Sequence, residues 1–135
     1  MDILPLSPDH DAAMAAIIRA NLKAHGLDVP GRAYYTVLEG DRVLGGIGLA
    51  EFRGDCCELQ KLYLAEEAKG RGLGYRLIRL IEDRALALGY RQIYLETHTN
   101  LAAAIHVYER AGYREIPRPA GVVHSTMNRF FVKSF

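Results

Sequence analysis

The clearest pattern of hydrophobic and polar positions lies in the middle of the chain. An apolar-rich run, Leu59–Leu64, has the composition of a β-strand and is followed, after five residues, by the glycine-rich segment Lys69–Arg76. Apolar residues then recur at helical spacing, at Leu73, Leu77, Leu80, Ile81 and Leu88. The pattern therefore predicts a strand, a glycine-rich turn and a helix that begins inside that turn.

The segments before this unit predict one helix and three strands. They are a strand at Met1–Leu6, a helix from Ser7 or Asp9 to about His25, and strands at Ala33–Leu38 and Arg42–Glu51. Glu39–Gly40–Asp41 joins the last two and is typical of a hairpin turn. Inside the last strand, Gly45, Gly46 and Gly48 indicate either a bulge or bend, which we favour, or the close approach of a ligand or neighbour.

The segments after the glycine-rich unit predict a second strand–helix pair and two further strands. They are a strand at Arg91–Thr97, a helix at Leu101–Ala111, a short strand at Tyr113–Ile116 and a final antiparallel strand at Val122–Val132. Helices and strands in this order predict an α/β (α+β) fold, with a mixed sheet and helices on both faces.

Composition limits the class of protein. The 135 residues fit a single domain, 1–135, and a net charge of +1 gives no overall field that favours nucleic acid or an anionic membrane. Met1–Pro8 lacks the basic start and apolar run of a secretory signal, and no stretch is long enough to span a membrane, so we expect a cytoplasmic protein. The adjacent Cys56 and Cys57 are expected to be structural thiols on opposite faces of a strand, with no metal site.

The glycine-rich turn is the main candidate for chemistry. Gly70, Gly72 and Gly74 let the backbone approach a ligand closely, and the first amides of the following helix have no partners within it. The helix dipole favours an anion there, and Lys69 and Arg71 add positive charge. We interpret the segment as a phosphate-binding site, the simpler alternative being a helix start with flexible turn residues.

A dinucleotide-binding turn is a second alternative for the same segment. That turn needs the spacing G-x-G-x-x-G directly after its strand, whereas here the spacing is G-x-G-x-G and Ala65–Lys69 intervenes. Glu96 does lie about twenty residues downstream, near the end of the next strand, as such sites require. The chain is too short for a second nucleotide-binding half and a substrate domain, so we rank this alternative lower.

Two motifs together resemble the GNAT superfamily of N-acetyltransferases. The first, Lys69–Gly70–Arg71–Gly72–Leu73–Gly74, is similar to the family's cofactor motif, with Lys69 where Arg or Gln is usual; lysine keeps the charge but loses the planar donors. The second, Asn100–Tyr113, is similar to the family's helix that ends in Tyr, three residues, Gly and an aromatic. The resemblance implies a mostly antiparallel central sheet with one splayed strand pair.

The resemblance also implies acetyl-CoA as the co-substrate. Its pyrophosphate would bind the amides of Gly70–Tyr75, and its pantetheine would lie along Leu62–Leu64 as an added strand, with the Leu64 amide bonded to the thioester oxygen. Asn100 would either bond to the pantetheine or simply cap its helix. The expected cofactor-binding residues are Leu62, Tyr63, Leu64, Lys69, Gly70, Arg71, Gly72, Leu73, Gly74, Tyr75 and Asn100.

Acetyl transfer requires an amine that loses a proton and a leaving thiolate that gains one. Tyr108 matches the family's acid position, a role compatible with a ring packed in the core. Glu58, eleven residues before Lys69, has the spacing of the catalytic Glu in the histone-acetyltransferase branch and is the candidate base; Glu96 is the alternative. Glu58, Glu96 and His124 are expected near the acceptor; for His124 the alternative is a strand histidine without a task.

The function implied is transfer of an acetyl group from acetyl-CoA to an amine of a small molecule or peptide, by direct attack in a ternary complex. The short linker Gly26–Arg32 suggests an acceptor site that is either open or completed by a second subunit of a homodimer. Two alternatives stay open: a catalytically silent acetyl-CoA-binding sensor and an acetylator of charged tRNA. The near-neutral charge weighs against nucleic acid.

Overall fold

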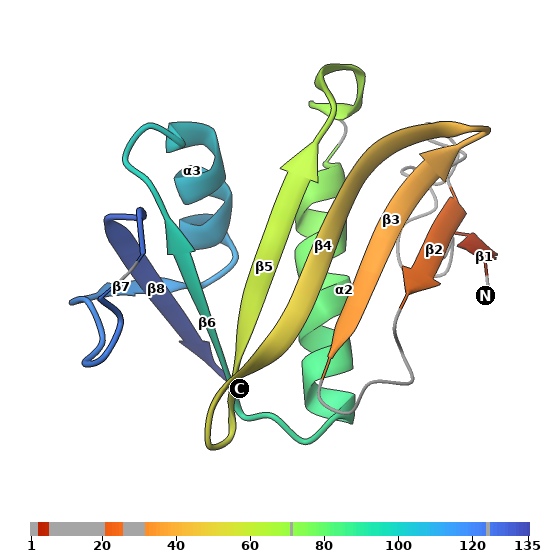
Figure 1. The fold of residues 1–135 in the computed structure, drawn as a ribbon. Helices are drawn as coiled ribbons and strands as arrows, with labels where there is room; N and C mark the ends of the chain where they lie inside the picture. Colours follow the sequence, from red (N-terminus) through yellow and green to blue (C-terminus); the bar gives the residue numbers. More distant parts are fainter. Residues whose placement is uncertain (1–2, 6–20, 26–31, 71, 124) are drawn as a thin grey trace.

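The computed structural model describes residues 3–5, 21–25, 32–70, 72–123 and 125–135. Their helices and strands follow one another as in Figure 1. They are β1 (Ile3–Pro5), β2 (Asn21–His25), β3 (Ala33–Glu39), β4 (Arg42–Arg53), β5 (Cys56–Leu64), the 3₁₀ turn η1 (Glu66–Ala68), α2 (Leu73–Ala87), β6 (Gln92–Thr97), α3 (Ala102–Arg110), β7 (Arg114–Ile116) and β8 (Arg129–Ser134).

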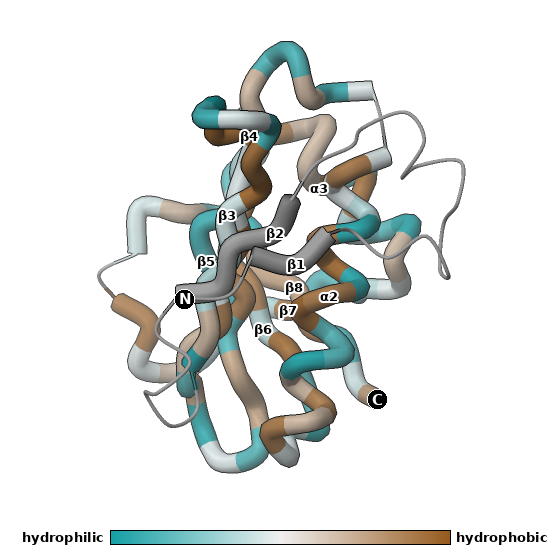
Figure 2. Tube along the Cα trace, turned by 90° about the vertical axis from the view of Figure 1, so that its right-hand side faces the viewer, coloured by the Kyte–Doolittle hydropathy of each residue, from teal (hydrophilic) through white to brown (hydrophobic). Residues whose placement is uncertain are grey.

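The strands form one sheet in the order β1-β2-β3-β4-β5-β6-β8-β7. Neighbouring strands are antiparallel except β5 and β6, which run parallel. The predicted mixed, mostly antiparallel sheet is therefore confirmed. Figures 1 and 2 show α2 and α3 on the same side of this sheet. The first predicted helix falls mainly in 6–20, outside the described residues.

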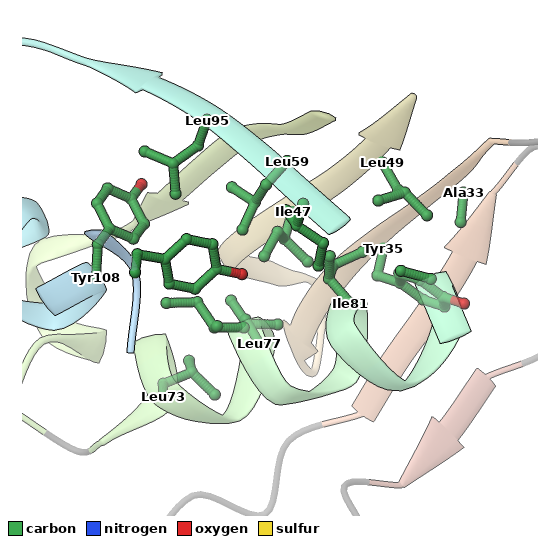
Figure 3. Packing of buried hydrophobic residues seen from close by; sticks show 14 of the residues in the cluster. Ala33, Tyr35, Ile47, Leu49, Leu59, Leu73, Leu77, Ile81, Leu95 and Tyr108 are labelled. Carbon is green, nitrogen blue, oxygen red and sulfur yellow. The ribbon is translucent and has the colours of Figure 1, made fainter. Parts of the chain in front are cut away.

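The main core lies between the sheet and the two helices. Strand alternation sends every second side chain into it, and the apolar stripes of α2 and α3 face it, as Figure 3 shows. Its fully buried members include Val37, Ile47, Leu77, Ile81, Ile93 and Phe131. A smaller cluster of Cys56, Tyr94 and Phe130 lies apart from this core, formed by alternate residues of β5, β6 and β8. We call the sheet face that carries it the open face.

Two predicted boundaries are wrong. Asn21–His25 is strand β2 and not the end of a helix, because its backbone pairs with both β1 and β3. Tertiary pairing of this kind overrides a local helical pattern. The last strand begins at Arg129 and not at Val122, since the Val122 and Met127 carbonyls accept hydrogen bonds from the Arg118 side chain. The other predicted elements from residue 33 onward are found within about three residues of their expected ends.

The glycines of β4 accommodate both a bulge and close neighbours. The β3–β4 register shifts between Val37 and Leu38, close to Gly45. A Cβ atom at Gly46 would lie 2.9 Å from the Tyr34 hydroxyl oxygen and 2.9 Å from the Tyr63 ring. The favoured bulge is thus present, but part of the glycine requirement comes from tyrosine side chains that cross the strand.

Cys56 and Cys57 are free, buried and on opposite faces of β5, as predicted. Burial raises the pKa of the Cys57 thiol to about 12 and also raises that of Cys56, so both stay protonated at neutral pH. Within the described part of the chain, no three His, Cys, Asp or Glu residues are grouped to hold a metal ion. The helices found there are also too short or too polar to cross a membrane.

Candidate active site

The site is built where β5 and β6 separate. The two strands are in register only at Cys56–Gln92, Cys57–Ile93 and Glu58–Tyr94. Beyond that point β5 continues to Leu64 and β6 to Thr97, and the two diverge, as Figure 1 shows. The splay implied by the resemblance is therefore present. Among the described residues, it leaves the β6-facing edge of Leu59–Leu64 without a partner strand, which is the arrangement that an added extended ligand needs.

A β-bulge interrupts β5 inside the splayed part. Gly48 pairs with Gln60 and Gly46 pairs with Tyr63. Between these pairs β5 advances three residues while β4 advances two, so β5 contains one extra residue. Lys61 has φ of 56°, the left-handed conformation that costs energy for a residue with a Cβ atom. The extra residue keeps Leu62 packed on the same core as Leu59, whereas plain alternation would point it to the other face. It also turns the backbone of Leu62–Leu64 relative to the first half of the strand.

The glycine-rich turn lies directly beyond the splay. Gly70 and Gly72 have φ of 78° and 71°, values that glycine adopts without strain. Arg76 N–H donates to Gly72 O at 3.3 Å as the first intrahelical bond of α2. The amides of Leu73–Tyr75 therefore have no acceptor within the helix. No side chain caps this terminus and no acidic residue lies in its first turn.

This turn fits a phosphate group in both shape and charge. A Cβ atom at Gly70 would meet no described atom within 4 Å, so there is free space beside this residue of the turn. Lys69 forms an exposed ion pair with Glu66 at 3.2 Å, a contact weak enough to exchange for another anion. Arg71, predicted to add positive charge, lies outside the described residues.

Tyr108 lies at the splay on α3 and is 6% exposed. Its ring packs against Tyr113 and Phe131, with centroid distances of 6.1 and 6.4 Å. Figure 3 shows its hydroxyl pointing toward Leu95 of β6, away from its own helix. Burial raises the pKa of Tyr108 to about 12, so the hydroxyl keeps its proton at neutral pH.

Glu58 and Glu96 lie on the open face beside the same opening. Glu58 is paired with Tyr94 in the β5–β6 register, and Glu96 is two residues further along β6, so all three face the same way. Gln60 Nε2 donates to Glu58 Oε1 at 3.0 Å. Burial raises the pKa of Glu58; the hydrogen bond from Gln60 opposes the rise and the charge of Glu96 adds to it.

Glu96 is held by two hydroxyl groups. Tyr94 Oη donates to Glu96 Oε2 at 2.8 Å, and Ser125 Oγ donates to Glu96 Oε1. Desolvation, followed by the hydrogen bond and charge of Glu96, raises the pKa of Tyr94, which keeps its hydroxyl a donor. The carboxylate is therefore fixed from both sides by its own strand and by the segment before β8.

Comparison with known proteins decides the family. A family model described as the acetyltransferase (GNAT) family matches residues 5–113. The chain belongs to this family.

Individual GNAT relatives agree with this assignment. The chain is 38% identical over 95 residues to the uncharacterized N-acetyltransferase YjgM of Escherichia coli K12, covering 68% of this chain and 57% of that protein. The chain spans about half the length of the curated relatives it matches.

Solved structures of low sequence identity show the same fold. A GNAT family acetyltransferase of Staphylococcus aureus Mu50 has a TM-score of 0.71 and 22% identity, covering 78% of this chain and 68% of that one. A GNAT family acetyltransferase of Elizabethkingia anophelis, solved with acetyl-CoA bound, has a TM-score of 0.68 and 13% identity, covering 86% and 98%.

Asn100, expected to bind the pantetheine or to cap its helix, does not cap the helix. Asn100 is exposed, and its backbone N–H donates to His98 Nδ1 at 3.1 Å. It does not cap the helix, because α3 has Leu101 at its N-cap and no side-chain cap bond. The capping explanation is therefore wrong, and the pantetheine role stays a prediction. His124 lies outside the described residues.

Sequence reasoning missed four residues that lie around this candidate site: Gln60, Lys61, Tyr94 and Ser125. Strand alternation could have found Gln60 and Tyr94, since each lies two positions from a candidate carboxylate and so on its face. Ser125 had no sequence signal, because its contact depends on how a loop folds back. The left-handed Lys61 also had none, since glycine or asparagine is usual there.

Proposed function

We propose that this domain transfers an acetyl group from acetyl-CoA to an amine of a small molecule or peptide, by direct attack in a ternary complex. The observation that carries the proposal is the splay between β5 and β6. Around it are an unpaired strand edge, the uncapped terminus of α2, a protonated tyrosine on the core side of the sheet and two carboxylates on its other side. Membership of the GNAT family, some of whose structures hold acetyl-CoA, supports the same reading.

The chain's residues divide the binding of acetyl-CoA between two elements. The amides of Leu73, Gly74 and Tyr75 and the open turn at Gly70 suit the pyrophosphate. The edge of Leu62–Leu64, turned by the bulge, suits the pantetheine and presents the Leu64 amide. When bound, acetyl-CoA supplies a thioester whose acetyl group a neutral amine can attack.

Tyr108 is the proposed acid. A pKa raised to about 12 keeps its proton available at neutral pH, and the ring is held by packing while the hydroxyl points away from the helix. The leaving thiolate would receive that proton.

Glu58 is the proposed base, acting directly or through water. Its raised pKa brings it closer to the pH at which it must accept a proton. Glu96, held between Tyr94 and Ser125, is the proposed binding group for the ammonium form of the acceptor. The opposite division of roles, with Glu96 as base, is the alternative that mutation must separate.

A thiol-release assay tests the proposal. The protein is mixed with acetyl-CoA and a panel of small amines, peptides and charged tRNA, and free CoA is measured with a thiol reagent. Release with an amine or peptide supports the proposal. Acetyl-CoA binding without release with any acceptor would instead identify a sensor, and salt-sensitive release only with charged tRNA would identify a tRNA acetylator.

A further inference from the structure

The segment between β7 and β8 is held by several contacts, among them two hydrogen bonds from Arg118 and one from the Arg53 side chain to Ala120 O. Arg118 Nη1 donates to Val122 O at 3.0 Å, and its Nη2 donates to Met127 O at 3.2 Å. The guanidinium also lies 4.8 Å from the centroid of the Phe130 ring. One planar group thus ties both ends of the 122–127 segment to the start of β8.

The same segment carries the hydroxyl that holds Glu96. Ser125 lies between the two carbonyls that Arg118 binds, and its Oγ accepts the Met127 N–H at 3.1 Å while donating to Glu96. The position of the Ser125 hydroxyl therefore depends on the backbone conformation that Arg118 fixes.

The Arg118 guanidinium packs on a stack of aromatic rings. Phe130 stacks with Tyr94 at 6.5 Å between centroids, and Tyr94 stacks with Phe52 at 4.2 Å. Tyr94 is 1% exposed and is the other donor to Glu96. Arg118 and Glu96 are thus connected along two routes, one through the loop and one through the stacked rings.

We propose that Arg118 is a positioning residue for the amine acceptor, acting through Ser125 on Glu96. Arg118 does not touch the acceptor. It fixes the 122–127 segment so that Ser125 and Tyr94 hold the Glu96 carboxylate in one orientation. The proposal rests on the proposed acetyltransferase function for the acceptor's identity, but its loop component is independent of catalysis.

Arg118→Ala and Arg118→Met test the kinetic component. Methionine keeps an apolar side chain over Phe130 but donates no hydrogen bond. It therefore distinguishes the effect of the two hydrogen bonds from the effect of packing on Phe130. In both variants the KM for the acceptor should rise about tenfold, because the bound amine loses an oriented partner. Both kcat and the dissociation constant of acetyl-CoA should stay within about twofold. Arg114→Ala, an exposed arginine on β7, is the matched control and should change nothing.

A double-mutant cycle then tests the route. In a Ser125→Ala background, Arg118→Ala should add less than about twofold to the acceptor KM, since both changes remove the same contact. Effects that multiply would overturn the proposal. So would an acceptor KM within twofold of the parent in Arg118→Ala and Arg118→Met, or an equal loss of acetyl-CoA binding.

Hydrogen exchange of the ligand-free protein tests the loop component without any acceptor. Amides of the 122–128 segment should exchange at least about tenfold faster in Arg118→Met than in the parent, with α2 unchanged. Unchanged exchange there would overturn the role of Arg118 even if acetyl transfer is found. Failure of acetyl transfer with faster exchange would overturn the proposed function alone.

Discussion

The two ends of the β5–β6 pair show how one parallel strand pair serves two purposes. At one end, Cys57 and Ile93 are paired in register and fully buried. At the other, Leu62–Leu64 and Thr97 have no register with each other, and the bulge, the glycine-rich turn and Tyr108 lie around the opening. Glu58 and Tyr94 form the last pair before the strands separate.

The difference teaches that this site depends on missing strand pairing. An unpaired edge in a sheet leaves backbone donors and acceptors unsatisfied, which is costly unless a ligand or water binds them. The paired end anchors both strands so that the other end can remain separated. Changes at the paired end should therefore affect stability, and changes at the open end should affect binding and turnover.

The largest effect is expected at the helix terminus beyond the open end. Gly72→Asp should lower acetyl-CoA affinity more than about a hundredfold, because it places a negative charge beside the amides of Leu73–Tyr75. Gly72→Asn is the matched control, since asparagine is similar in size, tolerates positive φ and is neutral. Calorimetry should find clearly weaker binding for Asp than for Asn, with both proteins folded. Equal binding by parent and Gly72→Asp would mean that the phosphates bind elsewhere.

Ile93→Ala tests the paired end of the two strands. Ile93 has 0% exposure in the main core, so truncation should lower the free energy of unfolding by about 2–5 kcal/mol. Urea denaturation measures this loss, and kcat per folded molecule should stay close to that of the parent. A large loss of kcat in the folded fraction would show that the paired end takes part in the chemistry.

Glu58→Gln tests the boundary between the two ends. Acetyl-CoA affinity should stay nearly constant while turnover falls by about ten- to a thousandfold, since the shape is kept and the proton acceptor removed. The loss should shrink as pH rises, because more of the amine is then already neutral. Rates measured across pH decide the role: a constant loss indicates positioning, and full activity would assign the base to Glu96 or to solvent. Glu51→Gln, an exposed carboxylate of β4, is the control.

The same substitution should not destabilise the fold. Burial is the main cause that raises the pKa of Glu58 above its unfolded value, so the folded protein holds this proton more tightly. The resulting contribution to stability is present below the unfolded pKa and is lost as pH rises through the folded pKa. At pH 7 the charged form disfavours folding, so thermal unfolding of Glu58→Gln should occur at the parent's temperature or above it. A lower temperature would mean that the carboxylate stabilises the fold.

The smallest effect is expected for Tyr108→Phe. The ring packing is kept and one hydroxyl is lost, so kcat should fall about tenfold or more with little change in acetyl-CoA binding. Tyr113→Phe is the matched control: it removes a hydrogen bond to Glu82 of 3.1 Å and should cost about 1 kcal/mol of stability with kcat retained. Equal kcat for the parent and Tyr108→Phe, in single-turnover measurements that exclude slow product release, would remove Tyr108 as the acid.

Sequence patterns predicted the parts of the molecule that are set by local preferences. The glycines at 70 and 72, the α2 stripe from Leu73 and the alternation of Cys56 and Cys57 all follow from backbone freedom or side-chain period, and the structure contains them as expected. The placement of Glu58 and Glu96 on one face follows from the same alternation once the strands are aligned.

Other parts depend on contacts between distant segments, which no local pattern records. Asn21–His25 is a strand because two partner strands flank it, and Val122–Asn128 is not one because the Arg118 side chain bonds two of its carbonyls. The splay likewise depends on where a parallel register stops. Ser125 reaches Glu96 across 29 residues, so its role could only be found in three dimensions.

Lys61 has a consequence for how this protein can change. Side chains along a strand point alternately to its two faces, and one inserted residue shifts this alternation by one position. Lys61 lies at the β5 bulge, so the side chains before it and those after it follow separate alternations. Substitutions at Glu58 and Gln60 therefore need not change which way the side chains of Leu62–Leu64 point. The proposed acceptor side and the proposed cofactor side of one continuous strand can therefore diverge independently.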